Sequence, residues 1–304
     1  MVNGAAKGGT GSGGSPAGPS DLRAAIELEL AGFSGRISVA YRGLMGATPA
    51  GRGDLGWNVD EPMPAASLIK LPILACALEA AELGELDLER RTTLRSDDVV
   101  TGDGVLRHLR PGLELTLFDL LTLMTIVSDN TATNLVLANV GSGRVRTWIR
   151  AAGMAGTELA GGLQLPPERR SEAQKAGAVN RTTAADVLGL LLALERGELL
   201  PGGANATMQS LLERNLRQDG IGGLLPIDSG VPDADGRSVR IASKEGCIAG
   251  VWHDAGIVRR ADGAPLFALA VLSTDADDRA EHWMQEGRVR IRRIARAAFE
   301  AASG

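Results

Sequence analysis

The chain has 304 residues, 44% of them hydrophobic, and a formal net charge of −5. This length and apolar content suffice for one large core or two smaller ones, which excludes disorder for most of the chain. Acidic and basic residues are interspersed, so there is no positive patch for a phosphate backbone and we do not expect a nucleic-acid partner. No apolar stretch approaches the ~20 residues that cross a bilayer, so we expect a soluble protein without a membrane partner.

Residues 1–20 consist mainly of Gly, Ser, Ala and Pro. They lack the apolar core of a secretory signal, so we expect a disordered tail and, for the sequence as given, a cytoplasmic protein. An export signal removed from the native start would instead make it an exported protein. We expect Cys76 and Cys247 to be reduced core residues, because two thiols in a chain of this size do not require a disulfide.

The first predicted elements are a helix and a hairpin. Ser20 can cap a helix over about residues 21–33, where apolar residues recur at helical spacing. Two β-like runs follow at residues 36–41 and 55–59 with a glycine-rich segment between them. We interpret these runs as an antiparallel hairpin.

A run of helices is predicted next. The first covers residues 67–83 and is apolar on all sides, which is typical of a helix at the centre of a domain. Pro72 is tolerated only in a first turn, so this helix should begin at or just after Ser67. Further helices are expected at residues 116–127, 131–140, 144–152, 183–195 and 206–216.

The C-terminal part changes character, with strands expected at residues 239–243, 251–259 and 266–274 and a long helix at 277–302. This element order predicts an α/β (α+β) fold in which terminal helices flank an antiparallel sheet and an all-α lobe is inserted. We assign the discontinuous α/β lobe to residues 21–62 and 214–304 and the all-α lobe to residues 63–213. We expect the active site at the interface of the two lobes.

The segment Ser67-Leu68-Ile69-Lys70 places a serine and a lysine three residues apart, on one face of a helix. A serine hydroxyl is a poor nucleophile until a neighbouring base takes its proton. Lys70 lies in an otherwise apolar helix, and burial would lower its pKa towards that of a working base. The alternative interpretation of this motif is a capping serine beside a solvated lysine.

The segment Ser128-Asp129-Asn130 lies in a short connection between two apolar helices. Such connections often present catalytic polar groups. Ser and Asp are also favoured helix caps and could simply begin the helix at Thr131.

The segment Ser243-Lys244-Glu245-Gly246 stands at the end of a predicted strand. A lysine there could hold a substrate carboxylate by a charge-assisted hydrogen bond. The alternative is a surface lysine at the end of a strand.

In this order, the S-x-x-K, S-D-N and late lysine–glycine segments resemble the motif set of class A β-lactamases and penicillin-binding proteins. The resemblance covers about residues 21–302 and includes the segment 180–183, which opens a helix. The stretch from Lys244 to Gly256 is similar to serine hydrolases grouped beside the true β-lactamases. The resemblance implies a β-lactamase/transpeptidase-like fold.

The resemblance also implies catalytic roles. Ser67 would be acylated, Lys70 would manage its proton, Ser128 would pass a proton to the leaving nitrogen, and Asn130 would position Lys70 and the substrate amide.

For substrate binding, the resemblance implies that Lys244 anchors a carboxylate beside Gly246. The backbone N–H groups of Ser67 and Cys247 would form the oxyanion hole. Neither a cofactor nor a metal is implied, and no metal-ligand cluster emerges.

Two segments depart from the family pattern. The K-T-G of the family is here Lys244-Glu245-Gly246, so a carboxylate that would repel a substrate carboxylate replaces a hydroxyl. The loop before Asn180, which in class A enzymes carries the Glu that activates water for deacylation, offers Glu168 and Glu172 at a different spacing. Either could be the deacylation base, and both could instead be solvated loop charges.

His253 and Asp254 are neighbours on a predicted strand, where adjacent side chains point to opposite faces. They are therefore not a catalytic pair with each other. We expect a structural hydrogen-bonding role for His253.

The resulting prediction is a monomeric serine hydrolase that acts on a small acyl substrate through acyl-Ser67. β-Lactam hydrolysis, with the antibiotic resistance this brings, is the leading activity. One alternative is an esterase or a D-Ala-D-Ala carboxypeptidase. Others are a penicillin-binding module that is acylated without turnover and a catalytically inactive scaffold.

Overall fold

The computed structural model describes residues 19–45, 54–227, 236–280, 282 and 284–303. Residues 1–18 of the expected tail lie outside these ranges. Residues 19 and 20, also assigned to the tail, instead open the first helix, α1 (Pro19–Leu30). Among the described residues, no helix combines the length and apolar character needed to span a membrane.

The centre of the fold is a five-stranded antiparallel sheet with the strand order β2-β1-β9-β8-β7. The predicted hairpin is present, with Val39 of one strand opposite Trp57 of the other. The strands are β1 (Arg36–Gly43), β2 (Asp54–Trp57), β7 (Val239–Ile248), β8 (Val251–Arg260) and β9 (Pro265–Thr274).

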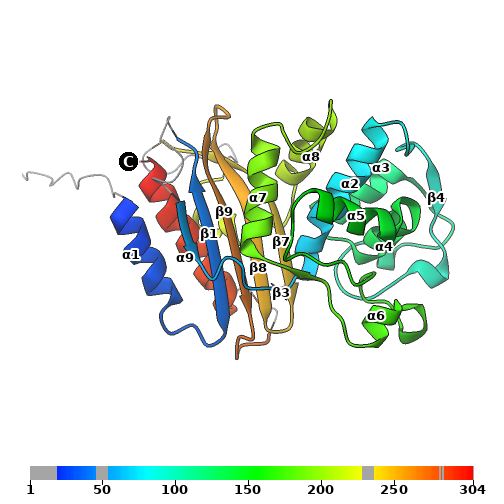
Figure 1. Cartoon of the computed structure of the whole chain (residues 1–304), viewed down its shortest axis with the longest axis horizontal. Helices are drawn as coiled ribbons and strands as arrows, with labels where there is room; N and C mark the ends of the chain where they lie inside the picture. The colour runs from blue at the N-terminus through cyan, green and yellow to red at the C-terminus, as the bar shows by residue number, and fades with distance from the viewer. Residues whose placement is uncertain (1–18, 46–53, 228–235, 281, 283, 304) are drawn as a thin grey trace, which may run out of the picture.

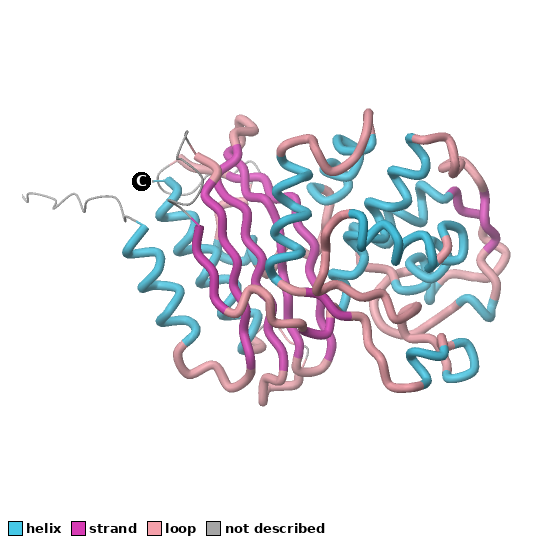
Figure 2. Tube along the Cα trace, viewed as in Figure 1, coloured by secondary structure: helices cyan, strands magenta, loops and turns pink. Residues whose placement is uncertain are grey.

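The two faces of the sheet are covered by different helices (Figures 1 and 2). Helices α1 and α9 (Glu286–Ser303) pack on one face, against alternate strand residues such as Val39 and Val271. The other face carries small residues such as Ala40 and Ala270 and packs against helix α7 (Ala184–Glu195). This alternation follows from the two-residue period of a strand.

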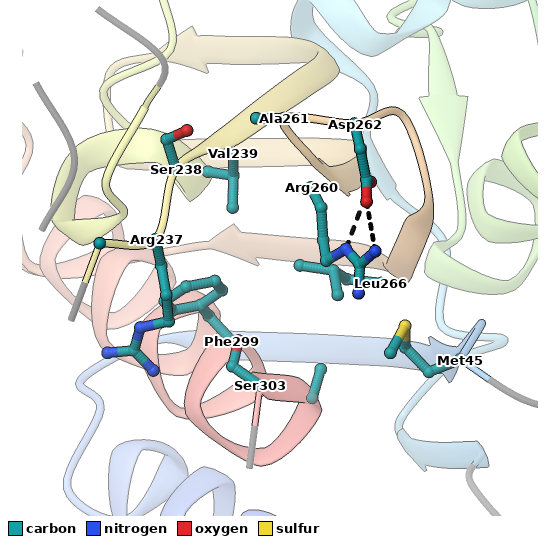
Figure 3. A pocket seen from close by; sticks show the side chains of 12 residues that line it. Met45, Arg237, Ser238, Val239, Arg260, Ala261, Asp262, Leu266, Phe299 and Ser303 are labelled. Atoms are coloured by element: carbon teal, nitrogen blue, oxygen red, sulfur yellow. Dashed lines mark hydrogen bonds and ion pairs between the residues drawn. The ribbon is translucent and has the colours of Figure 1, made fainter. Parts of the chain in front are cut away.

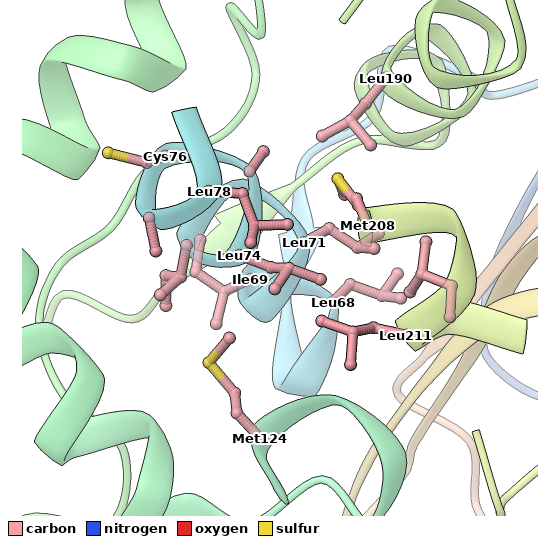
Figure 4. Close-up of a cluster of buried hydrophobic side chains, with 14 of the residues drawn as sticks. Leu68, Ile69, Leu71, Leu74, Cys76, Leu78, Met124, Leu190, Met208 and Leu211 are labelled. Carbon is pink, nitrogen blue, oxygen red and sulfur yellow. The ribbon is translucent and has the colours of Figure 1, made fainter. Parts of the chain in front are cut away.

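The helical part surrounds α2 (Lys70–Glu82), which is buried on nearly all sides, as its apolar sequence predicts. Leu68, Leu71 and Leu74 pack there with Met124 and Met208 from two other helices (Figure 4). The surrounding helices are α3 (Leu117–Ile126), α4 (Asn130–Val140), α5 (Ser142–Ala151) and α8 (Ala204–Glu213), with the short α6 (Glu172–Lys175) outside them.

Two small antiparallel ribbons lie within the segment 63–213 that was expected to be all-α. One pairs β3 (Met63–Pro64) with β6 (Arg181–Thr182), and the other pairs β4 (Arg91–Thr93) with β5 (Glu114–Thr116). Short 3₁₀ helices complete the chain, namely η1 (Ala66–Ile69), η2 (Ser96–Asp98), η3 (Leu106–His108), η4 (Pro167–Arg169) and η5 (Ile221–Leu224). The segment is therefore mainly helical, and its helix α7 belongs with the sheet.

The last helix begins at Glu286, later than the predicted residue 277. The side chain of Gln285 explains the difference, because its Oε1 accepts from the backbone N–H of Arg288 at 3.0 Å while its Nε2 donates to Asp278 O at 3.0 Å. These bonds satisfy a free N–H of the first helical turn and hold the preceding segment in a loop. Strand β7 is longer than the predicted 239–243 and continues to Ile248.

Candidate active site

The segment that leads into Ser67 is held from two sides. Ala65 N donates to Asn180 O at 2.8 Å. His253 Nε2 lies 2.7 Å from Pro64 O, while His253 Nδ1 accepts from the backbone N–H of Ser273 at 3.1 Å. His253 therefore carries its proton on Nε2 and tethers the segment, in agreement with the expected structural role. Burial lowers the pKa of His253 to about 4, so the ring is neutral at neutral pH.

Ser67 lies in η1 and Lys70 is the first residue of α2, so the two helical segments join between them. The side chain of Lys70 is 1% exposed. Its Nζ lies 2.6 Å from Ser128 O, 3.0 Å from Ser128 Oγ and 3.0 Å from Asn130 Oδ1. Burial, with a further contribution from the charge of Lys244, holds the pKa of Lys70 well below its usual range. A lowered pKa favours the neutral amine, which is the form that can act as a base. The burial of Lys70 rules out the solvated lysine of the alternative interpretation.

Ser128 and Asp129 lie in the connection from α3 to α4, and Asn130 is the first residue of α4. Asp129 caps α4 by accepting from Ala132 N at 2.8 Å, and its other oxygen accepts from Val105 N at 2.7 Å and Leu106 N at 2.8 Å. The tripeptide therefore serves both expected purposes, because Asp129 caps the helix while Ser128 contributes its hydroxyl to the site. These bonds anchor a connection in which Ser128 has φ 56°, a left-handed conformation that side-chain-bearing residues rarely adopt.

Lys244 lies on β7 and contacts the hydroxyl of Ser128, which Lys70 also contacts. Its Nζ lies 3.0 Å from Ser128 Oγ, and its side chain is 1% exposed. Ser128 Oγ thus lies between the amines of Lys70 and Lys244. This burial rules out the alternative of a surface lysine.

Gly246 allows β7 to approach the nucleophile closely. A Cβ atom at this position would lie 2.9 Å from Ser67 N and 3.2 Å from Leu68 N, closer than real Cβ atoms tolerate without a shift. Ser67 and Cys247 line one cavity of about 340 Å³, together with Ala66, Gly102, Asp103, Arg107, Asn130, Leu163, Gln164 and Ile248. The structure therefore brings the predicted nucleophile Ser67 and Cys247, the two residues of the predicted oxyanion hole, to one cavity.

Backbone conformations that cost free energy gather at this cavity. Among the described residues, five residues other than glycine have positive φ. Two of these, Ala66 and Gln164, line the cavity, and a third, Ser128, precedes the cavity-lining Asn130 by two residues. Such conformations cost on the order of 1–3 kcal/mol each and tend to cluster at active sites. Their position here supports the assignment of this cavity as the candidate active site.

Neither candidate deacylation base reaches the cavity. Glu168 is exposed in η4, and the carboxylate of Glu172 is 89% exposed and pairs with Lys175 at 2.8 Å. The loop faces the cavity with Leu163 and Gln164 instead. The side chain of Asn134 holds Leu163 in place, because its Oδ1 accepts from Leu163 N and its Nδ2 donates to Leu163 O, both at 2.8 Å.

The sequence analysis did not identify Leu163, because only carboxylates of this loop were considered as candidates. It also did not identify Asn134, which lies outside the loop on α4. Asn134 lies one helical turn after Asn130 on α4, so the two side chains share a helix face. Because the start of α4 forms part of the site, this spacing could have indicated that Asn134 lies near it.

A second cavity, of about 410 Å³, lies at the other end of the sheet, between its strands and α9 (Figure 3). It is bordered by Met45, Arg237 and Phe299 and by the ion pair of Arg260 with Asp262. Over the described part of the chain, no three His, Cys, Asp or Glu side chains group as a metal site would need. Cys76 and Cys247 are both buried and form no disulfide.

The antiparallel sheet with its two helical layers, and the serine–lysine site at the edge of that sheet, define the class of penicillin-recognising serine enzymes. The model of the Beta-lactamase enzyme family matches residues 21–302, and the chain belongs to that family.

Individual relatives agree with this assignment. A β-lactamase from Sphaerobacter thermophilus has 29% sequence identity and a TM-score of 0.78, over 93% of this chain and 97% of the other. PBP-A has 23% identity and a TM-score of 0.75, over 92% and 94% of the two chains, which shows a common fold. The β-lactamase regulatory protein BlaB of Streptomyces cacaoi is 26% identical over 283 residues, which span 79% of this chain and 88% of that protein.

Proposed function

We propose that this protein is a serine acyl-transfer hydrolase whose Ser67 is acylated by a β-lactam or by another strained or activated acyl compound. The observation that carries the proposal is the contact of the Ser128 hydroxyl with two buried lysine amines. Lys70 Nζ and Lys244 Nζ each lie 3.0 Å from Ser128 Oγ. This arrangement contains a base for the nucleophile and a proton path to a leaving group.

The proposed reaction begins with neutral Lys70, which takes the hydroxyl proton of Ser67 as its Oγ forms a bond to the acyl carbon. The backbone N–H groups of Ser67 and Cys247 would stabilise the resulting oxyanion, an interaction that typically contributes ~3–4 kcal/mol. When the C–N bond breaks, the nitrogen takes the proton of Ser128 Oγ. Ser128 then regains a proton from Lys70 across their 3.0 Å contact, which returns Lys70 to its neutral form.

Hydrolysis of the acyl-enzyme needs a group that activates water, and the loop at residues 163–164 supports a second candidate function. Leu163 and Gln164, rather than Glu168 or Glu172, line this side of the cavity. A penicillin-recognising module that holds its acyl group for a long time would have such a loop. One relative is named as a regulatory protein, which fits a role in sensing β-lactams.

The mass of the intact protein after incubation with penicillin G, nitrocefin and a short activated acyl ester tests these functions together. Wild type should gain the mass of one acyl group, and Ser67→Ala should gain none. A lasting adduct favours the binding module, whereas consumed ligand with unchanged protein mass favours the hydrolase. Turnover of the ester alone, with β-lactams as inhibitors, favours an esterase or D-Ala-D-Ala peptidase. Equal turnover by Ser67→Ala contradicts the proposal, as does the absence of any adduct and any turnover in wild type.

A further inference from the structure

Glu245 is a buried carboxylate within the polar cluster of the candidate site. It is 2% exposed and lies next to Lys244 on β7. Its Oε1 accepts from Lys244 Nζ at 2.9 Å, and its Oε2 accepts from Asn215 Nδ2 at 2.9 Å. Arg217 Nε lies 3.5 Å from the same Oε1. Burial alone would raise the pKa of Glu245, but the charges of Lys244 and Arg217 outweigh burial and lower it, so the carboxylate is ionised.

The ammonium group of Lys244 has no donor left for a ligand. A lysine has three N–H donors. The contacts of Lys244 Nζ are Glu245 Oε1 at 2.9 Å, Ser128 Oγ at 3.0 Å and Glu245 O at 3.1 Å. A substrate carboxylate could bind Lys244 only by displacing one of these partners.

Arg217, the other cation on this side of the cluster, is also paired. Its Nη1 lies 2.7 Å from Asp103 Oδ1, and Asp103 lines the cavity. The charges of Lys244 and Arg217 are thus opposed by those of Glu245 and Asp103. These four side chains together carry no net charge.

One further cation, Arg107, lines the cavity from the helical side. It is exposed, and its Nη1 donates to Gly102 O at 2.7 Å. Water screens a charge in this position, so its attraction for an anion is weak.

We propose that Glu245 serves as a built-in carboxylate that binds Lys244 and balances the charge of Arg217, so that the protein selects acyl substrates that are uncharged beside the reacting bond. Esters and amides at that position are accepted, and free carboxylates are disfavoured. The inference rests on the proposed function and specifies its class of substrate. It follows from simple electrostatics, because a substrate anion next to Glu245 would place two buried like charges side by side.

Penicillin G and its methyl ester form a matched pair of probes, since they share the ring and the acyl side chain and differ in one charge. The second-order rate of acylation of Ser67 is measured for both by intact mass at one ionic strength. Wild type should react at least about tenfold faster with the ester. Glu245→Gln should shift the ratio of the two rates towards the free acid by about tenfold to a hundredfold, the range for one charge-assisted contact. Because each ratio compares two probes on one protein, a partial loss of stability does not affect it.

Two variants serve as controls. Glu85→Gln removes an exposed carboxylate that pairs with Arg144 far from the cavity, and it should leave the ratio unchanged. Arg107→Gln tests the remaining cation, and a ratio that depends on Arg107 but not on Glu245 overturns the inference. If wild type reacts faster with the free acid than with the ester, the inference is overturned. This measurement needs no variant, so it remains decisive if Glu245→Gln does not fold.

Binding of the two probes to Ser67→Ala separates this inference from the proposed function. Selective binding of the ester without acylation of wild type would refute the acyl-transfer function and leave the selectivity intact. Acylation of wild type at equal rates by both probes would support the acyl-transfer function and refute the selectivity. If Ser67→Ala binds neither probe and wild type is not acylated, both proposals fail.

Discussion

Lys70 shows how a single environment changes the chemistry of a side chain. The residue is 1% exposed, and its Nζ contacts are the carbonyl and hydroxyl of Ser128 and the amide oxygen of Asn130. A neutral amine can donate its two protons to the two carbonyl-type oxygens and still offer a lone pair. The neighbours thus accommodate the neutral form without an unsatisfied charge.

We expect Lys70→Met to slow acylation of Ser67 by about 10²–10⁴-fold, the usual contribution of a positioned base. Methionine has a similar length and suits a buried position, so the fold should be retained. Stopped-flow or intact-mass kinetics would measure the change. Wild-type acylation should rise with pH as Lys70 loses its proton, over a range below that of an ordinary lysine because its pKa is lowered. A variant that acylates as fast as wild type would remove Lys70 from the proposed mechanism.

At the scale of elements, the site depends on how closely a strand and a helix start approach each other. Gly246 on β7 faces η1, where a Cβ atom would lie 3.2 Å from Ala66 Cβ and 2.9 Å from Ser67 N. Backbone atoms cannot move aside as a flexible side chain can, so the contact sets the distance between the strand and the nucleophile.

Gly246→Ala should therefore slow acylation by at least about tenfold, because a displacement of the order of 1 Å at a reacting centre can cost about 10²-fold. Gly143→Ala is the matched control, since nothing lies within 4 Å of its added Cβ and it stands in α5. That change should leave acylation unaltered and stabilise the helix by roughly 0.5–1 kcal/mol. Equal acylation rates for the two variants would show that the close approach has no catalytic role.

The loop held by Asn134 is the second element that shapes the site. Leu163 lines the cavity, and its backbone N and O are both bonded to that asparagine. A carboxylate placed there could activate water against the acyl-enzyme. We expect Leu163→Glu to shorten the lifetime of the acyl adduct by at least about tenfold, within the range of general-base catalysis. Glu168→Gln, which alters an exposed position, should leave the lifetime unchanged. If Glu168→Gln lengthens it instead, the loop moves during the reaction.

For the whole molecule, two buried neighbours make stability depend on pH in opposite directions. Burial lowers the pKa of His253 to about 4, so its contribution to stability is lost as pH falls from about 6.5 to 4. Burial raises the pKa of Asp254 from 3.8 to about 7, so the folded protein keeps a proton that the unfolded chain releases. The contribution of Asp254 is present below pH 3.8 and is lost as pH rises through about 7.

Asp254→Asn should remove this second dependence. Asparagine keeps an oxygen that can accept from Ile221 N, now bonded to Asp254 Oδ2 at 2.7 Å, and it carries no titrating group. The gain in the free energy of unfolding over wild type should grow from pH 4 to pH 8 and reach on the order of a few kcal/mol. Urea titrations across this pH range would measure it, with the exposed Asp262→Asn as control. A gain that is independent of pH would contradict the raised pKa.

The order of elements and the three motifs could be predicted from the sequence because they depend on local spacing. A three-residue separation places Ser67 and Lys70 on one helix face, and alternation places Val39 and Ala40 on opposite faces of the sheet. The hairpin, the buried helix α2 and the three C-terminal strands follow from the same periodicities. The start of α9 could not be predicted in this way, because it depends on hydrogen bonds of the Gln285 side chain and not on the spacing of apolar residues.

The sequence by itself determined the candidate site residues, and the tertiary structure alone decided how they are paired. Ser128 meets Lys70 across 58 positions of the chain and Lys244 across 116, and only the closure of the fold sets those distances. Glu168 and Glu172 were both candidates for the deacylation base, whereas in the folded loop both are exposed and Leu163 lines the cavity. Glu245 was expected to repel a substrate carboxylate, and the structure adds that it is buried 2.9 Å from Lys244 Nζ and 3.5 Å from Arg217 Nε. Local periodicity depends on residues that are close together in the sequence, whereas burial and charge pairing depend on segments far apart in the chain.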